Sequence, residues 1–301
     1  MEQAMYYVNS IKTLISQFVG ILILLAFSQM SFSQDQEGVL VFEFEGDQGT
    51  QSDQLSVMAA GTTANYTLRP SVITSRFGNG VQELPFKIGC FSIYGGGYAT
   101  DCQITFNNIT VTPYSGGHNH DDASRPAGTV DPMTNNTAGS TQADFKFTAP
   151  EISGYVTASG SGVGTINGVP MYFSGSTTFE VKISGLVELI SSSDYQLVGS
   201  TSNHTKNHYG VPSLNASLQT VARAYRLQTG DLMRINDMSL LDGGLFDIYG
   251  SWAPSHYTHR FGNNTDIGFP SNHVNKRTLR SLAIQQGFAV LTEGNHFHFS
   301  L

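Results

Sequence analysis

Residues 39–45 read Val-Leu-Val-Phe-Glu-Phe-Glu, an apolar run that passes into strict alternation of aromatic and charged side chains. Because successive side chains of a β-strand point to opposite faces, this stretch predicts a strand with one buried face. Three further stretches have the same character: residues 103–106, 144–147 and 178–183. Gly, Ser, Asn and Pro separate these stretches, and none of the chain up to about residue 190 has a convincing helical period. We therefore predict an all-β sandwich over residues 34–190.

One stretch inside this region has a more specific pattern. Residues 147–156 read Phe-Thr-Ala-Pro-Glu-Ile-Ser-Gly-Tyr-Val, in which a strand start containing Pro precedes a Ser-Gly turn. This stretch resembles a recurring segment of bacterial immunoglobulin-like repeats. The resemblance implies that the sandwich is immunoglobulin-like.

Length and composition limit the class of protein. The chain has 301 residues, which favours two folded units, and only 13% of them are charged. A chain rich in Gly, Ser, Thr and Asn with so few charges is typical of a β-rich exported protein. The formal net charge is −8 and no basic cluster occurs, so nucleic acid is not expected as a partner.

The N-terminus has the features of a targeting segment. Lys12 precedes a mostly apolar stretch at 14–27, and small residues then flank Phe32 as Ser31 and Ser33. We predict a signal peptide over residues 1–33 and an exported product that is periplasmic, at the cell surface or extracellular. A retained membrane anchor is the alternative, but the apolar run is shorter than the about 20 residues that a span needs. After cleavage no membrane span is expected.

The chain contains two cysteines, Cys90 and Cys102. In an exported protein a pair at this spacing is expected to form a disulfide that closes a glycine-rich loop or hairpin. Two buried free thiols are the alternative.

The pattern changes after about residue 191. One face of a helical period carries Leu214, Leu218, Val221, Ala222 and Tyr225. Ser213 is the predicted N-cap of this helix, and Gly230 lies just past its end. A second helix is predicted over 276–286, with Gly287 after it. Predicted strands cover 231–238, 288–291 and 296–301, so residues 191–301 should form a small α+β domain with an antiparallel sheet.

Two histidine motifs lie in this last region. In the first, His259 and Asp266 are seven residues apart with Gly262 between them, and the second contains His296 and His298. Residues two apart on a strand share a face. A catalytic zinc site uses three ligands from His, Asp, Glu and Cys and keeps a fourth position for water. A turn at Gly262 is expected to bring His259 and Asp266 to one point.

The order and spacing of these motifs carry a family resemblance. The pattern His-x-x-Gly-x-x-x-Asp followed by His-x-His resembles the lysostaphin, D-Ala-D-Ala peptidase and hedgehog superfamily, and within it the penicillin-insensitive murein endopeptidases. Residues 235–246 are similar to the run before the first metal motif in that branch. The resemblance covers roughly residues 231–301.

The resemblance implies a role for each of these residues. His259, Asp266 and His298 would be the zinc ligands, His296 the general base or transition-state stabiliser, and His256 an outer group of the site. Some relatives have a catalytic Glu before the last metal His, and Glu293 could take that part. The choice of base between His296 and Glu293 stays open, with His296 favoured.

The chemistry implied is zinc-dependent hydrolysis of peptide bonds, with peptidoglycan cross-links as the substrate. Zn²⁺ lowers the pKa of its water to about 7 and polarises the scissile carbonyl. A cation such as Arg234 or Arg260 would hold a substrate carboxylate. The alternative is a surface binding or adhesion protein that keeps zinc without catalysis. Oligomeric state is left open.

The remaining histidines receive plainer interpretations. His118 and His120 precede Asp121 and Asp122, which suggests a metal site, but no distant third ligand is evident, so an exposed polar loop is favoured. His204 and His208 are expected to be solvated in a linker. His273 is expected in a loop, and His256 taken alone has an equal claim to be a surface histidine.

Overall fold

The structure is a computed structural model that describes residues 37–44, 63–71, 81–94, 96–120, 125–253 and 256–301. Residues Glu37–Leu301 form one compact unit. The predicted signal peptide at 1–33 lies outside the described residues and stays a prediction. Among the helices of the described residues, none combines the length and apolarity needed to cross a membrane.

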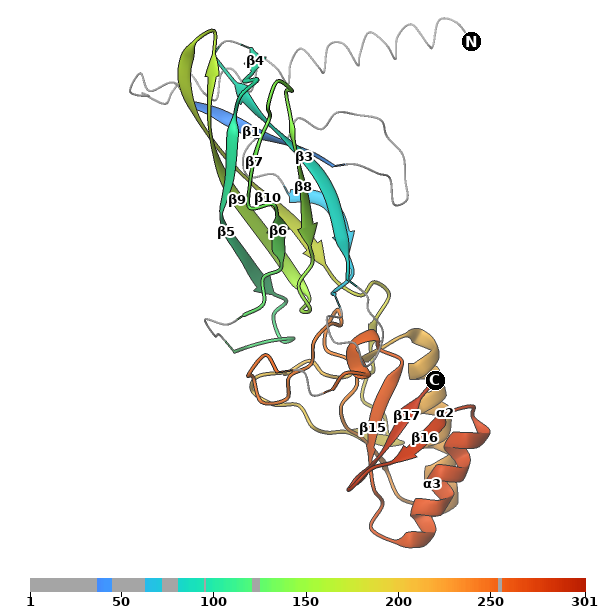
Figure 1. Cartoon of the computed structure of the whole chain (residues 1–301). Helices are drawn as coiled ribbons and strands as arrows, with labels where there is room; N and C mark the ends of the chain where they lie inside the picture. Colours follow the sequence, from blue (N-terminus) through green and yellow to red (C-terminus); the bar gives the residue numbers. More distant parts are fainter. Residues whose placement is uncertain (1–36, 45–62, 72–80, 95, 121–124, 254–255) are drawn as a thin grey trace, which may run out of the picture. The chain divides into compact units, whose positions relative to one another are not determined.

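The first part of the described chain is a β-sheet of ten strands. These are β1 (Glu37–Phe44), β2 (Thr63–Leu68), β3 (Glu83–Ser92), β4 (Gly97–Tyr98), β5 (Gln103–Pro113), β6 (Thr129–Asp131), β7 (Thr134–Asn136), β8 (Ala143–Thr148), β9 (Gly154–Ile166) and β10 (Val169–Val181). The main path runs β6-β8-β3-β1-β10-β9-β5-β7, with β2 beside β10 and β4 beside β3 (Figure 1). The described residues before Pro212 contain no helix, so the predicted all-β character is confirmed.

This sheet bends so that its two halves face each other. The ring of Phe106 on β5 lies 6.0 Å from that of Phe86 on β3 and 5.3 Å from that of Phe145 on β8, although β5 is a neighbour of neither strand. The amide of Asn135 on β7 donates to the carbonyl oxygen of Asp144 on β8 at 2.8 Å. Two facing layers over one aromatic core agree with the predicted sandwich. The finer immunoglobulin-like assignment stays a prediction.

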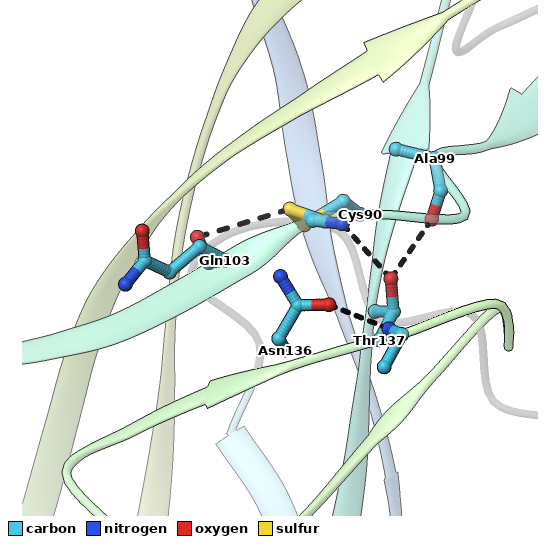
Figure 2. Close-up of a disulfide and its surroundings, with 7 residues drawn as sticks. Cys90, Ala99, Gln103, Asn136 and Thr137 are labelled. Atoms are coloured by element: carbon cyan, nitrogen blue, oxygen red, sulfur yellow. Dashed lines mark hydrogen bonds between the residues drawn. A yellow bond between two sulfur atoms is a disulfide. The ribbon is translucent and has the colours of Figure 1, made fainter.

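The predicted disulfide is confirmed. Cys90 on β3 is bonded to Cys102, the residue before β5, and both residues are fully buried (Figure 2). The backbone N–H of Cys102 donates to the hydroxyl of Thr137 at 2.9 Å, and the backbone N–H of Thr137 donates to the carbonyl of Cys102 at 3.0 Å. The bridge therefore ties β3 and β5 inside the core.

The second part of the chain contains a smaller sheet. The strands are β11 (Val187–Glu188), β12 (Tyr195–Leu197), β13 (Tyr209–Gly210), β14 (Met233–Ile235), β15 (Asn264–Gly268), β16 (Ala289–Thr292) and β17 (His296–Ser300). Five of them form a sheet in the order β12-β14-β15-β17-β16, and β11 pairs with β13. The helices are α2 (Pro212–Thr229), α3 (His273–Gln285) and the 3₁₀ turn η1 (His259–Phe261).

The prediction of an antiparallel sheet is wrong at one edge. β14, β15, β17 and β16 are antiparallel neighbours, but β12 and β14 are parallel. The chain passes from β12 through α2 to β14, and a crossover through a helix returns the next strand in the same direction.

Both helices exist where the periodicity predicts them, with different starts. α2 begins at Pro212, and Val211 rather than Ser213 is its N-cap, because Pro is preorganised for the first turn and lacks the N–H that a cap would satisfy. Gly230 ends the helix as predicted, in a left-handed conformation with φ of 77°. α3 begins at His273 rather than residue 276, so His273 is helical and not in a loop. The side chain of Asn272 caps it by accepting the N–H of Asn275 at 2.7 Å.

Candidate metal centre

Strand pairing positions the second histidine motif against the first. In the β15–β17 pair, Asp266 is opposite His298 and Gly268 is opposite His296. Side chains directly opposite each other leave the same face of a sheet, so Asp266, His296 and His298 share one face. His259 reaches this face from η1. The turn after it uses Gly262 at φ of 74°, where a Cβ would lie 2.3 Å from Leu186.

The three residues predicted as metal ligands come together. Nδ1 of His298 lies 2.9 Å and Nε2 of His259 lies 3.4 Å from the same carboxylate oxygen, Oδ1 of Asp266. The centres of the two imidazole rings are 5.1 Å apart. The exposed fraction of the side chain is 12% for His298, 1% for His259 and 4% for Asp266. The fold therefore brings together, in one buried site, residues that are up to 39 positions apart in the sequence.

Hydrogen bonding on the far side of His298 fixes which nitrogen faces this focus. The amide nitrogen of Asn264 donates to the carbonyl of Thr258 at 2.7 Å, so its Oδ1 is the acceptor that lies 3.1 Å from Nε2 of His298. An amide oxygen accepts only, so Nε2 of His298 carries the proton. The other ring nitrogen, Nδ1, faces Asp266.

His259 is oriented in the same manner. Its Nδ1 lies 3.2 Å from the carbonyl oxygen of Met238, which again accepts only. Nδ1–H of His259 can donate to this carbonyl, and Nε2 of the same ring points at Asp266. A second hydrogen bond that sets tautomer and ring orientation is the usual arrangement around metal-binding histidines.

Asp266 completes the focus as an anion. Burial alone raises the pKa of this carboxyl, but interaction with His259 and His298 outweighs it and holds the pKa below its ordinary value. Two ring nitrogens therefore face one ionised carboxylate oxygen, and this donor set could bind a cation in place of the protons. The group of His256, His259 and Asp266, whose ligand atoms all lie within 4.8 Å of one another, could hold a metal ion.

His256 lies at the edge of the same group. Its Nδ1 is 3.7 Å from Oδ2 of Asp266, and its Nε2 is 3.8 Å from Oδ2 of Asp237. Burial, helped by the nearby His259, lowers the pKa of His256 to about 4, so its imidazole is neutral near pH 7. The alternative of an isolated surface histidine does not hold, because only 14% of its side chain is exposed.

His296 and Glu293 lie beside the focus and contact each other. Nε2 of His296 is 3.1 Å from Oε2 of Glu293 and 3.5 Å from Oδ2 of Asp266. Nδ1 of His296 is 2.9 Å from the side-chain oxygen of Asn295. Nε2 of His296 thus faces the glutamate directly, and the geometry does not choose between the two as base.

The two arginines named from the sequence differ in position. Arg260 is buried and its guanidinium donates to Glu151 at 2.7 Å, so it joins the two parts of the chain and is unsuited to holding a substrate. Arg234 is exposed and sits opposite Gly268, whose other neighbour is His296. A groove of about 370 Å³ begins there, lined in part by Arg234, Gly268 and Ser271.

Sequence patterns did not reveal Asn264, Asp237 or Asn207. Asp237 accepts hydrogen bonds from the side chains of Asn207 at 2.8 Å and Asn236 at 3.0 Å, and burial raises its pKa. Asn264 could have been noticed as a polar residue two positions from Asp266, hence on the same face of a strand. The other two have no local signal, because their contacts depend on how distant segments meet.

Three further histidine predictions are wrong. His118 is 7% exposed rather than part of an exposed polar loop, and Asp121 and Asp122 beside it lie outside the described residues. His204 and His208 are 1% and 7% exposed rather than solvated. His208 contacts the carbonyl of Val198 at 2.9 Å, and His204 contacts Asp247 at 3.1 Å.

Comparison with known proteins gives no assignment. No protein-family model matches the chain, and no curated protein matches it. Among solved structures, the ASH/PapD-like domain of human CEP192 matches with 9% identity and a TM-score of 0.28, over 51% of this chain and 90% of that one. An exo-β-N-acetylglucosaminidase of Vibrio harveyi matches with 7% identity and a TM-score of 0.16, over 78% of this chain and 38% of that one. At these TM-scores neither likeness supports a conclusion about fold or function.

Proposed function

We propose that this chain is an exported zinc metallopeptidase that hydrolyses peptide bonds, with the cross-links of peptidoglycan as its substrate. The observation that carries the proposal is that two ring nitrogens, Nε2 of His259 and Nδ1 of His298, face the same oxygen of the ionised Asp266 carboxylate. Imidazole nitrogen and carboxylate oxygen form a donor set that suits Zn²⁺. The proposal of peptidoglycan rests on the family resemblance of the two motifs.

Zinc held by His259, Asp266 and His298 would supply Lewis acidity for attack by water on a carbonyl group. The chain's own residues supply the proton transfer. Glu293 and His296 lie 3.1 Å apart at the open side of the site, where the His296 side chain is 24% and the Glu293 side chain 43% exposed. Groups in this position can accept a proton from the attacking water and return it to the leaving amine.

Substrate would be oriented by residues at the Gly268 end of β15. Arg234 lies across β15 from His296, at the start of the groove, and its guanidinium suits a substrate carboxylate. The neutral imidazole of His256 adds a donor or acceptor on the other side of Asp266. The site thus contains candidates for metal binding, proton transfer and substrate binding on one strand pair and its flanking turn.

The proposal is tested with purified protein and peptidoglycan, and the soluble muropeptides are measured. Zinc-loaded protein is expected to release them, a chelator to stop the release, and Zn²⁺ to restore it. In Glu293→Gln and His296→Gln, kcat should fall by about 10²–10⁴-fold for the residue that acts as base. Glu83→Gln is the matched control, because Glu83 is also a surface ion-pair carboxylate, with 44% of its side chain exposed.

The rival function is a zinc-containing binding or adhesion protein. It predicts that the double variant of Glu293 and His296 keeps its zinc and every measurable activity. Absence of chelator-sensitive release by the wild-type protein would exclude hydrolysis of peptidoglycan. Cleavage of a general protein substrate in the same assay would instead keep the metallopeptidase and reject the cell-wall substrate.

A further inference from the structure

A second group of metal-binding side chains lies apart from the centre described above. It consists of His118, His120, His204 and Asp247, named here the HHHD cluster. The two first histidines follow β5, His204 precedes β13, and Asp247 lies in the segment before η1. The loop after β5 is bonded to the segment of His204 in both directions, by Asn119 N–H to the carbonyl of Asn203 at 2.7 Å and Lys206 N–H to the carbonyl of Gly116 at 2.9 Å.

The four ligand atoms lie within 4.8 Å of one another, and five of their six separations are 3.1–3.4 Å. Oδ1 of Asp247 lies 3.3 Å from Nδ1 of His118, 3.4 Å from Nε2 of His120 and 3.1 Å from Nε2 of His204. Nδ1 of His118 lies 3.3 Å from both other nitrogens. For a tetrahedral zinc ion with ligands at about 2.0 Å, neighbouring ligand atoms are about 3.3 Å apart. These five separations fit that geometry.

Hydrogen bonds alone do not account for these contacts. Each nitrogen would need a proton in order to donate to Oδ1 of Asp247, but then Nδ1–H of His118 would face N–H groups of both other rings. If a nitrogen is unprotonated, its lone pair faces the carboxylate instead. A cation at the centre of the four ligand atoms resolves every one of these contacts at once.

The surroundings hold the cluster away from water. The side chains of His118, His204 and Asp247 are 3%, 1% and 0% exposed, and that of His120 is 10% exposed. Trp252 covers the rings of His118 and His120 at 4.9 and 4.3 Å, and its backbone N–H donates to the other oxygen of Asp247. A buried carboxylate among three imidazoles needs a charge partner, because an isolated charge in such a place is strongly disfavoured.

We infer that the HHHD cluster binds one Zn²⁺ ion as a structural site. Three imidazoles and a carboxylate are a donor set that suits zinc. The carboxylate takes the fourth vertex, so no position is left for water, and closed four-ligand sites are structural rather than catalytic. The ion joins the loop that leaves the sandwich to two segments of the C-terminal part, independently of the centre at Asp266.

The experiment measures zinc bound per protein after dialysis, using the full chain and Zn²⁺ alone. We expect two ions in the wild type, one in Asp266→Asn and one in Asp247→Asn. The Asp266→Asn variant leaves the HHHD cluster intact. When a chelator removes its remaining ion, the Tm of this variant should fall. Zero zinc in folded Asp266→Asn would overturn the inference, and this result does not require any cluster variant to fold.

A second variant separates a lost ligand from a lost fold. His120→Gln changes the most exposed of the four ligands, so the chain should fold and retain one ion, at the Asp266 centre. Loaded with Co²⁺ in the Asp266→Asn background, the cluster should show the intense visible bands of a tetrahedral ion, and His120→Gln should abolish them. Unchanged bands, or two zinc ions in folded His120→Gln, would contradict the assignment.

Discussion

Asn264 decides how His298 presents itself to the metal centre. Its side-chain oxygen accepts from Nε2 of His298 at 3.1 Å and also from the hydroxyl of Ser300, while its amide nitrogen is held by the carbonyl of Thr258. This arrangement leaves Nδ1 of His298 to face Asp266. A residue that contacts no metal can thus set the metal affinity through the tautomer of a ligand.

The first prediction follows from this hydrogen bond. Asn264→Ala removes the acceptor for Nε2 of His298, so zinc affinity at the Asp266 centre should fall by about 10- to 100-fold. Ser300→Ala is the control, because it removes the other donor to the same oxygen and keeps the contact with His298. The affinity is measured by competition with a chelating dye in the Asp247→Asn background. Equal affinity of Asn264→Ala and Ser300→Ala would contradict this role.

The second prediction concerns pH and the metal-free protein. Burial lowers the pKa of His256 from 6.5 to about 4, so the unfolded chain takes up a proton at a higher pH than the folded chain. Protonation therefore favours unfolding, and stability should be lost as pH falls from about 6.5 to about 4, by at most about 3 kcal/mol from this group.

Urea unfolding in the presence of a chelator at pH 7 and pH 4.5 measures this loss. His256→Gln should show a smaller difference between the two pH values than the wild type does. The depressed pKa of Asp266 adds a loss that begins at lower pH, in both proteins. Identical pH dependence in the two proteins would contradict the assigned environment of His256.

At this scale the sequence predicts ligands better than their partners. His259, Asp266 and His298 are found from spacing, because a turn at Gly262 and the two-residue period of a strand are local properties. Asp237, His204 and Asp247 are not found, because each meets its partners through loops whose path depends on the whole fold. The spacing of His118 and His120 suggests a metal motif, but the third histidine of the cluster, His204, lies 84 residues beyond His120.

At the scale of elements, strand β9 shows how packing can hide a pattern. Its buried positions include Val156, Ala158, Gly160, Gly162 and Gly164, so apolar alternation is weak although the strand is thirteen residues long. A Cβ on Gly162 would lie 2.9 Å from the sulfur atoms of both Cys90 and Cys102. The disulfide therefore requires a residue without a side chain on the facing strand.

The third prediction tests this contact. Gly162→Ala should lower the free energy of unfolding by about 1–3 kcal/mol, because an added methyl group overpacks the core beside the disulfide. Gly97→Ala is the matched control, since Gly97 is also a strand residue of ordinary φ and a Cβ there meets nothing within 4 Å. Denaturant unfolding of both variants decides it. Equal free energies of unfolding for the two variants would contradict the prediction, because the core would then accommodate the added methyl group at Gly162.

The sequence predicts that a helix exists more reliably than it predicts the residue at which the helix begins. The helical face from Leu214 to Tyr225 is buried as predicted, because a 3.6-residue period is a strong signal. The predicted starts of α2 and α3 differ from the observed ones by two and three residues, because Pro212 and Asn272 act as start signals in place of Ser213 and Lys276. The parallel pairing of β12 depends on which strand becomes its neighbour after the helical crossover. The two-residue alternation of a strand does not reveal which strand is its neighbour.

At the scale of the whole molecule, buried polar contacts join residues of the sandwich to residues of the C-terminal part. Arg260 donates to Glu151, and the hydroxyl of Ser153 donates to the carbonyl of Asp242 at 2.6 Å. Arg260, which makes the first of these contacts, is the residue directly after His259 in the sequence. The sandwich therefore contributes to holding the turn that carries the metal ligand His259.

The most direct test of the metal centre is anomalous diffraction at the zinc absorption edge, from crystals of the full chain grown with Zn²⁺. The account predicts a peak with Nε2 of His259, a carboxylate oxygen of Asp266 and Nδ1 of His298 all at about 2.0–2.2 Å. A zinc peak bound by other residues, or the absence of a peak at Asp266 in zinc-saturated crystals, would contradict it.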